Sequence, residues 1–159
     1  MTPNPRYGIG TLVNHLAEGN DPLHAQVTPI YQTTAFSFDD AASSAAAFQD
    51  PQHTWIYARW RNPNQEQLAA KVTALEAFDL MRAQPERPLQ DIAGGLVFSS
   101  GMAAIVAAIL ARLTPGATII AQPSLYAASY NFLKTWGEQY CFKTIFVDDP
   151  APEAWESAF

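Results

Sequence analysis

The sequence predicts an α/β fold in which an extended N-terminal arm precedes a small parallel or mixed sheet with flanking helices. The main observation is a strand, helix, strand, helix, strand pattern from Gly95 onward, formed by LVFS, GMAAIVAAILARL, ATIIAQ, residues 125–136 and FKTIFV. Short connections between such units imply parallel strands joined by right-handed crossovers. Pro115-Gly116 and Gly137 stand where the two helices are expected to stop.

Residues 1–60 form the predicted arm, because they contain few long periodic segments and are rich in Pro, Thr and aromatic residues. One short helix is expected inside the arm, from Asp39 or Asp40 to about Phe48. The other apolar side chains of the arm have no evident local core; they include Ile30, Tyr31, Phe36, Phe38 and Trp55. We therefore expect them to pack against another surface.

Residues 61–159 are predicted to begin the main domain, which starts with a helix. Asn62 is suited to cap this helix, Pro63 to occupy its first position, and Gln65 to complete a capping box. Apolar residues then recur at helical spacing until about Phe78, namely Leu68, Val72 and Leu75. The segment 78–94 carries two prolines and mixed charges, which indicates a surface connection with room for one helical turn.

The predicted sheet has only three strands, at 96–99, 117–122 and 142–147, and a further helix is expected to begin at about Pro152. So thin a sheet leaves exposed edges, which natural proteins usually cover or extend. The pattern therefore suggests that the fold is incomplete at Phe159.

The composition indicates a globular protein. With 48% hydrophobic and 15% charged residues, the 159-residue chain is long enough for one domain with a buried core. Its 9 basic and 15 acidic residues give a net charge of -6, and no basic run offsets this charge, which argues against a nucleic-acid partner. The first twenty residues lack a secretory signal, and the apolar run from Met102 to Leu110 is too short to span a membrane. We expect a cytoplasmic, soluble protein without a membrane partner.

A lone cysteine and three histidines indicate neither a disulfide nor a metal site. Cys141 has no partner for an intramolecular disulfide and is expected to be a small buried side chain. His15, His24 and His53 lack the spacing of metal ligands and are expected on the surface or in the arm.

The tetrapeptide Ser99-Ser100-Gly101-Met102 lies between a predicted strand and a predicted helix. Ser100 is the expected N-cap, and Gly101 allows a ligand to approach the backbone. Free N–H groups at such a helix start, together with the helix dipole, suit an anion. The alternative is a capped helix whose small residue serves close packing.

Tyr57 and Arg59 stand two residues apart in a stretch without helical periodicity. If this stretch is extended, their side chains project from the same side, where a hydroxyl and a guanidinium suit a phosphate. The alternative is that Trp55 and Tyr57 pack while Arg59 and Arg61 stay solvated.

Tyr126 begins the helix that follows the second predicted strand. Ligands in open α/β sheets collect at the carboxyl ends of the strands, so an aromatic side chain there suits stacking on a flat ring. The alternative is core packing, because Tyr126 shares a helical stripe with Tyr130, Leu133 and Trp136.

Four motifs in this order, TPIYQTTAF, YARWRNP, FSSGMAAI and PSLYAASY, resemble the Cys/Met-metabolism family of pyridoxal-phosphate enzymes. That family includes cystathionine γ-synthase, cystathionine γ-lyase, O-acetylhomoserine sulfhydrylase and methionine γ-lyase. The resemblance covers nearly the whole chain apart from residues 78–94. It implies the first part of a fold-type I large domain, pyridoxal 5'-phosphate as cofactor, and an amino-acid substrate.

The resemblance also implies roles for particular residues. Gly101 and Met102 would give backbone N–H groups to the cofactor phosphate, with the Ser100 hydroxyl nearby, and Tyr126 would stack on the pyridine ring. Tyr57 and Arg59 would bind the phosphate of a neighbouring subunit's cofactor, because the family's arm crosses a subunit interface.

The chain departs from the family's usual motifs at two places. It has Arg61-Asn62-Pro63-Asn64 where Gly-Asn-Pro-Thr is common, so Arg61 adds bulk and charge beside the phosphate ligands. It has Tyr126-Ala127-Ala128-Ser129 where Tyr-Gly-Gly-Thr is usual. Methionine γ-lyases tend to have a Cys at the position of Ala128, which argues against a dedicated methionine γ-lyase.

Family members are more than twice as long as this chain. The resemblance implies that the Schiff-base lysine in its Ser-x-Thr-Lys setting, the Asp that pairs with the pyridinium nitrogen, and the Arg for the substrate carboxylate all lie beyond Phe159. Lys71, Lys134 and Lys143 lack that setting, so no catalytic residue is expected within the chain.

Three hypotheses follow. In the first, the chain is the N-terminal part of an enzyme for γ-elimination or γ-replacement on homoserine- or cysteine-derived amino acids, inactive alone. In the second, it is a non-catalytic chain that associates with a full-length relative through its arm. In the third, it is an unrelated small α/β binding module.

Overall fold

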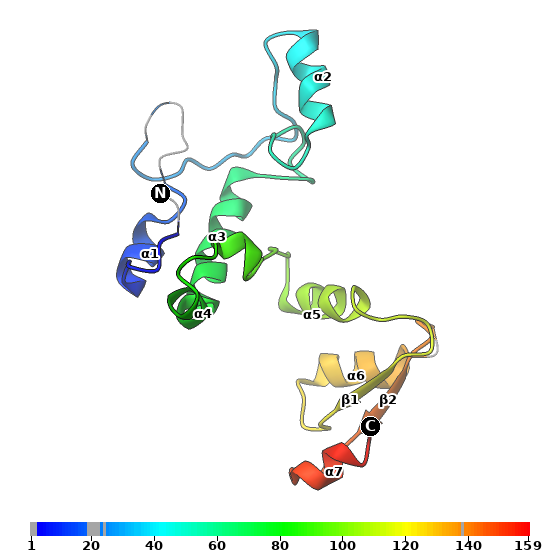
Figure 1. Ribbon diagram of the computed structural model, residues 1–159. Helices are drawn as coiled ribbons and strands as arrows, with labels where there is room; N and C mark the ends of the chain where they lie inside the picture. Colours follow the sequence, from blue (N-terminus) through cyan, green and yellow to red (C-terminus); the bar gives the residue numbers. More distant parts are fainter. Residues whose placement is uncertain (1–2, 19–22, 24, 138) are drawn as a thin grey trace. The chain divides into compact units, whose positions relative to one another are not determined.

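The computed structural model describes residues 3–18, 23, 25–137 and 139–159, and the chain divides into two compact units, Met1–Val97 and Phe98–Phe159 (Figure 1). Each unit has its own cluster of buried apolar side chains. The predicted division between residues 60 and 61 falls inside the first unit and stays a prediction.

The first unit is helical and is built around one core. Its elements are α1 (Ile9–His15), α2 (Ala41–Gln49), α3 (Pro63–Glu76), α4 (Phe78–Ala83) and a 3-10 turn, η1 (Leu89–Asp91). The sequence did not reveal α1, because seven residues are too few for a periodic pattern to show. Leu12 of α1 and the following Leu16 are fully buried and pack against Ala74, Ala77 and Met81. The start of the predicted arm therefore packs against α3 and α4, whereas Ile30, one of the side chains expected to lack a local core, is 87% exposed.

Helix α2 lies where the sequence predicts a helix within the arm. Asp40 is its N-cap, and the Ser43 amide donates a 2.7 Å hydrogen bond to the Asp40 carboxylate. The Asp40 amide donates to the Ser43 hydroxyl over 3.3 Å, which completes a capping box. The cap explains why an Ala-rich segment with little apolar patterning begins a helix at this point.

Helix α3 also begins at the predicted residue, with Asn62 accepting from the Asn64 amide over 2.9 Å. Gln65 does not complete a capping box within the described residues. The apolar residues that mark α3 in the sequence, Leu68, Val72 and Leu75, are exposed. Its buried residues are instead Pro63, Thr73 and Ala74. The small side chain of Ala74 allows Leu12 of α1 and Leu16 to pack closely against the helix.

The segment 78–94, predicted as a surface connection with one helical turn, is mostly exposed but carries more helix than expected. It contains α4 and η1, and the α4 residue Met81 belongs to the buried core. Leu89, Ile92 and Ala93 pack against the same core. Pro85 and Pro88 lie between the two helical pieces, so they separate short elements and do not mark a loop without structure.

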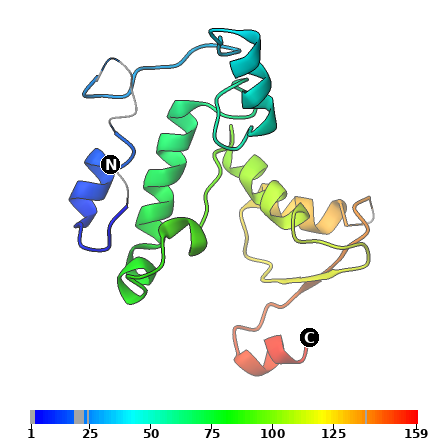
Figure 2. The same ribbon diagram turned by 45° about the horizontal axis from the view of Figure 1, so that its top comes forward.

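The second unit contains the predicted parallel strand pair. Its elements are α5 (Gly101–Leu110), β1 (Thr118–Ala121), α6 (Ala127–Thr135), β2 (Lys143–Phe146) and α7 (Pro152–Glu156). The strands β1 and β2 pair in parallel, with Thr118 opposite Lys143 and Ala121 opposite Phe146. Helix α6 connects them, and it packs against α5 (Figure 2). Side chains from both helices and both strands enclose a core around Phe132, Leu133 and Phe142.

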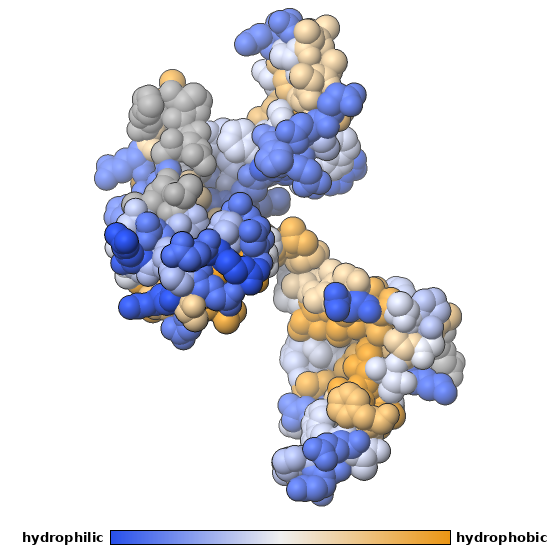
Figure 3. Space-filling view, viewed as in Figure 1, coloured by the Kyte–Doolittle hydropathy of each residue, from blue (hydrophilic) through white to orange (hydrophobic). Residues whose placement is uncertain are grey.

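The predicted first strand, residues 96–99, is absent from the described structure. A strand requires a neighbour for its backbone hydrogen bonds, and β1 pairs with β2 alone. Leu96 is accordingly 84% exposed. Apolar side chains also gather on the face of the second unit seen in Figure 3, over α5 and the strands. Ile105 of α5 and Ile145 of β2 are among the exposed apolar residues of this unit.

Cys141 is exposed, and the prediction that it is buried is wrong. It lies in the turn before β2 with a φ angle of 55°, in the left-handed region. The next residue, Phe142, fills the core position instead. The predicted third strand therefore begins one residue late, at Lys143.

Candidate functional site

The first turn of α5 presents backbone donors to open space. Ser100 is the N-cap, and its hydroxyl accepts a 3.1 Å hydrogen bond from the Ala103 amide. Within the described part of the chain, no group accepts from the amides of Gly101 or Met102. A Cβ atom at Gly101 would meet no atom within 4 Å. The helix is therefore capped, and it still offers two free N–H groups at its positive end.

The side chain of Met102 fixes this turn to the neighbouring helix. It packs against the core of the second unit, and its Sδ atom accepts a 3.5 Å hydrogen bond from the Ser129 hydroxyl. Ser129 lies in the first turns of α6, so this contact brings the N-terminal parts of α5 and α6 together. The sequence reasoning missed Ser129, whose only signal was its place in the YAAS motif.

Tyr126 occupies the N-cap position of α6, at the end of the loop that follows the carboxyl end of β1 at Ala121. Its side chain is 72% exposed, so it does not pack in the core. Within the predicted stripe, Leu133 is buried and the Tyr130 ring lies 4.7 Å from that of Phe146, whereas Trp136 is 47% exposed. The Tyr126 ring is therefore available to a ligand. We refer to Ser100, Gly101, Met102 and Tyr126 as the helix site.

Tyr57 and Arg59 come together in the first unit, although the reason differs from the predicted one. Tyr57 forms an antiparallel bridge with Ala35, but the chain then turns, and the Trp60 amide donates back to the Tyr57 carbonyl over 2.9 Å. The turn places the Arg59 guanidinium 5.1 Å from the centre of the Tyr57 ring. Arg59 is exposed and makes no ion pair within the described residues. We refer to Tyr57 and Arg59 as the arm pair.

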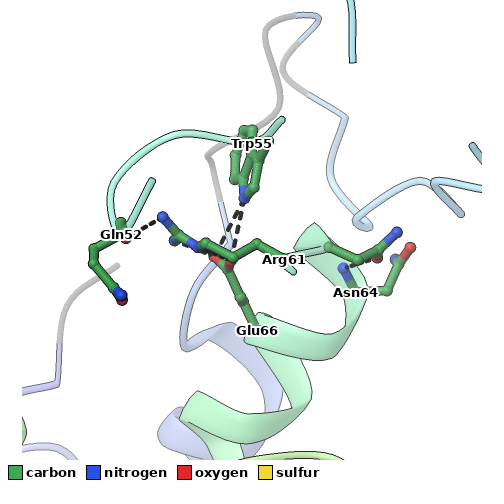
Figure 4. Close-up of polar contacts among 6 residues, drawn as sticks. Gln52, Trp55, Arg61, Asn64 and Glu66 are labelled. Carbon is green, nitrogen blue, oxygen red and sulfur yellow. Dashed lines mark hydrogen bonds and ion pairs between the residues drawn. The ribbon is translucent and has the colours of Figure 1, made fainter. Parts of the chain in front are cut away.

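Arg61 is paired within the first unit. Its Nε atom lies 2.5 Å from one Glu66 oxygen, and its second terminal nitrogen donates to the other oxygen over 2.8 Å (Figure 4). The charge of Arg61 is therefore balanced, and Arg59 is the arginine of this segment that is exposed without a carboxylate partner. The expectation that Arg61 adds bulk and charge beside a phosphate stays a prediction, and the pairing with Glu66 reduces the charge available for it.

None of the three lysines contacts a residue of the helix site or of the arm pair among the contacts of the described residues. The Lys71 ammonium donates to the Asn14 carbonyl over 3.2 Å, and the Lys134 ammonium lies 5.5 Å from the centre of the Tyr130 ring. Lys143 is an exposed residue of β2.

The described residues contain no group of three His, Cys, Asp or Glu side chains that could hold a metal ion. His15 and His53 instead pair with Glu18 and Asp50, three residues away in each case, and His24 lies outside the described residues. Nor does any helix in the described part of the chain have the length and hydropathy to cross a membrane.

Comparison with known proteins identifies the family. Residues 10–159 match the model of the Cys/Met metabolism PLP-dependent enzymes, and the chain belongs to this family. The resemblance of the four motifs is thus confirmed, and pyridoxal 5'-phosphate is the family's cofactor.

Individual relatives include both lyases and transferases. The chain is 30% identical over 153 residues to L-methionine gamma-lyase of Porphyromonas gingivalis, covering 96% of this chain and 35% of that protein. It is 30% identical over 149 residues to O-acetyl-L-homoserine sulfhydrylase of Leptospira meyeri, covering 93% of this chain and 30% of that protein. The chain therefore spans about a third of the length of the curated relatives it matches.

A solved structure shares the fold. It is a putative O-acetylhomoserine (thiol)-lyase of Campylobacter jejuni, with a TM-score of 0.76 and 22% identity, covering 97% of this chain and 34% of that one. That protein contains a pyridoxyl-lysine 5'-monophosphate residue. In the present chain, the free amides of Gly101 and Met102 and the exposed Tyr126 ring fit a phosphorylated flat cofactor.

Proposed function

We propose that the chain is the phosphate-binding, N-terminal part of a PLP-dependent enzyme for γ-elimination or γ-replacement on homoserine- or cysteine-derived amino acids. The observation that carries this proposal is the capped start of α5 with free amides at Gly101 and Met102. The reactions named for the relatives support the substrate class. We also infer that β1, α6 and β2 belong to a fold-type I large domain, an inference supported by the shared fold.

When bound, the cofactor supplies an electron sink for cleavage of bonds around the substrate's amino-acid carbons. The residues of the helix site hold and orient it. Gly101 and Met102 donate backbone hydrogen bonds to the phosphate, and the Ser100 hydroxyl lies beside them. Tyr126 offers the face of its exposed ring to the pyridine ring, which fixes the ring's plane.

The arm pair has a second role in this proposal. Arg59 presents two parallel donors to a phosphate oxygen pair, and the Tyr57 hydroxyl adds a third donor. Because Tyr57 and Arg59 lie on the arm, we assign them to the cofactor phosphate of a neighbouring subunit. The assembly is then a homo-oligomer in which each arm completes a site that it does not itself contain.

Chemistry within the 159 residues is not part of the proposal. Lys71, Lys134 and Lys143 each lie outside the helix site and lack a Ser-x-Thr-Lys setting. We expect no γ-elimination by the purified chain with added pyridoxal 5'-phosphate and homoserine-derived substrates. Measurable turnover that depends on the cofactor would contradict this expectation.

The experiment that tests phosphate binding uses a probe without an aldehyde, 4-deoxypyridoxine 5'-phosphate, which cannot react with lysines. Titration calorimetry compares the unchanged chain with the Gly101→Asp variant, and unphosphorylated 4-deoxypyridoxine is the control ligand. We expect the aspartate to weaken probe binding at least about tenfold, through charge repulsion and loss of space. Equal affinity of the two proteins, or equal affinity for the two ligands, would refute the proposal.

A further inference from the structure

A polar cluster joins the segment before α3 to the first turn of that helix (Figure 4). At its centre is Glu66, which receives two hydrogen bonds from Arg61, at 2.5 and 2.8 Å. The Trp55 indole N–H lies 3.3 Å from both Glu66 oxygens, and Arg61 also donates to the Gln52 carbonyl. We call these four residues the Glu66 cluster.

The interaction between Arg61 and Glu66 should be stronger than that of an ordinary surface ion pair. A bidentate guanidinium and carboxylate pair fixes both side chains in one plane. The side chains of Arg61 and Glu66 are only 26% and 34% exposed, so solvent screens their interaction incompletely. Each member of the cluster therefore limits the freedom of the others.

In the sequence, members of the Glu66 cluster lie on both sides of the arm pair. Gln52 and Trp55 precede Tyr57 and Arg59, and Arg61 follows them. Between these anchors, the Phe36 amide donates to the Ile56 carbonyl over 3.0 Å, and the Ala58 amide donates to the Thr34 carbonyl over 2.9 Å. The turn that brings Arg59 to the Tyr57 ring is thus held at both ends.

We propose that Arg61 is a positioning residue: through Glu66 it holds the segment 52–61 on α3, so that Tyr57 and Arg59 keep their phosphate-binding arrangement. The positioning role rests on the proposed function of the arm pair. Because Glu66 balances the charge of Arg61, Arg59 and not Arg61 is the arginine that binds the phosphate in this proposal.

The first readout is hydrogen exchange at the amides of Phe36 and Ala58, which report opening of the segment without any ligand. We expect exchange in Arg61→Met and in Glu66→Gln to be at least about tenfold faster, because local opening no longer breaks the cluster. The double variant should be little faster than either single one, because both changes remove the same interaction. The matched control is Arg87→Met, since Arg87 contacts only Gln84 and the Asp91 carbonyl within the described residues.

The second readout is calorimetric binding of 4-deoxypyridoxine 5'-phosphate, made at a protein concentration at which the chain is self-associated, because the arm pair is assigned to the site of a neighbouring subunit. We expect Arg61→Met to weaken binding about tenfold, Arg87→Met to leave it unchanged, and Arg59→Met to weaken it without faster exchange. Exchange in Arg61→Met no faster than in the control would overturn the proposal. Weaker binding with unchanged exchange would also overturn it, because Arg61 would then be a direct phosphate ligand.

Two further outcomes separate this inference from the proposed function. If Arg61→Met speeds exchange but keeps full affinity while Arg59→Met loses affinity, the positioning role is wrong and the phosphate role of Arg59 stands. If neither variant changes affinity, the phosphate role of the arm pair is wrong, and the Glu66 cluster serves stability alone.

Discussion

Asn64 holds Tyr31 at the start of α3, because its Oδ1 atom accepts a 2.8 Å hydrogen bond from the Tyr31 amide. The same side chain donates through Nδ2 to the Pro29 carbonyl over 2.8 Å, and Asn62 donates to the Tyr31 carbonyl over 2.9 Å. Two asparagines thus fix residues 29–31 to the helix. A threonine, the residue common in the family at position 64, has a shorter side chain with one donor.

Replacing Asn64 should release the arm from α3. We expect Asn64→Ala to lower the free energy of unfolding by about 1–2 kcal/mol. The Tyr31 amide and the Pro29 carbonyl both lose their hydrogen-bond partner, and of the two only the exposed Pro29 carbonyl can bond to water instead. Urea denaturation measures the change. Asn14→Ala is the control, because that side chain bonds only to Gly10 within α1 among the described residues. A loss no larger than that of the control would contradict the structure.

At Gly101, stability and cofactor binding should respond in opposite directions. A methyl group meets no atom within 4 Å there, and alanine favours the helix by up to about 1 kcal/mol over glycine. Gly101→Ala should therefore unfold at the same or higher urea concentration while binding 4-deoxypyridoxine 5'-phosphate at least about tenfold more weakly. Gly10→Ala, which is equally open, should keep the affinity. Unchanged affinity in Gly101→Ala would count against the helix site.

The start of α2 should depend on pH. Hydrogen bonds from the backbone and then the side chain of Ser43 hold the pKa of Asp40 below the ordinary aspartate value. The stabilisation of the cap is thus fully present above the unfolded pKa, about 4, and is lost as pH falls through the lower folded value. NMR titration of the Ser43 amide shift should follow this transition. Asp40→Asn should remove the transition and Asp39→Asn should not.

Gly95 should not tolerate a side chain. A Cβ atom there would lie 2.3 Å from the Thr73 hydroxyl oxygen and 3.2 Å from the Ala69 carbonyl oxygen. We expect Gly95→Ala to cost about 1–3 kcal/mol by overpacking. Gly95→Ala should cost less stability in the Thr73→Ala background than in the unchanged chain, because the hydroxyl that it meets is then absent. Thermal unfolding measures both effects, and strictly additive losses would show that the contact is not their cause.

The local features of this fold were predictable from sequence. Asp40, Asn62 and Ser100 cap the predicted helix starts, and Pro152 is the first residue of α7, because helix starts depend on a few neighbouring residues. The strand predicted at 96–99 is absent from the described residues, because a strand forms only where a partner offers hydrogen bonds, and neighbouring residues alone do not show this. Helix α1 was missed because its stability comes from packing of Leu12 on α3 and not from its own pattern.

The sequence predicts residues for the candidate site but not their geometry, and their cofactor roles stay predictions. The exposed Tyr126 ring and the open amide of Gly101 agree with the residue types that suggested them. Tyr57 and Arg59 meet through a turn, not through an extended strand, and only three-dimensional contacts show this. Opposite charges at positions 61 and 66 were a visible signal for the Glu66 cluster, but its bidentate geometry required the structure.

The most direct test of the account is an NMR titration of the isotopically labelled chain with 4-deoxypyridoxine 5'-phosphate, following the backbone amides of Gly101 and Met102. We predict that these two resonances shift in a saturable manner with the phosphorylated probe, and that unphosphorylated 4-deoxypyridoxine leaves them in place. Saturable shifts confined to other residues, or identical shifts with both ligands, would contradict the claim that the start of α5 holds the cofactor phosphate.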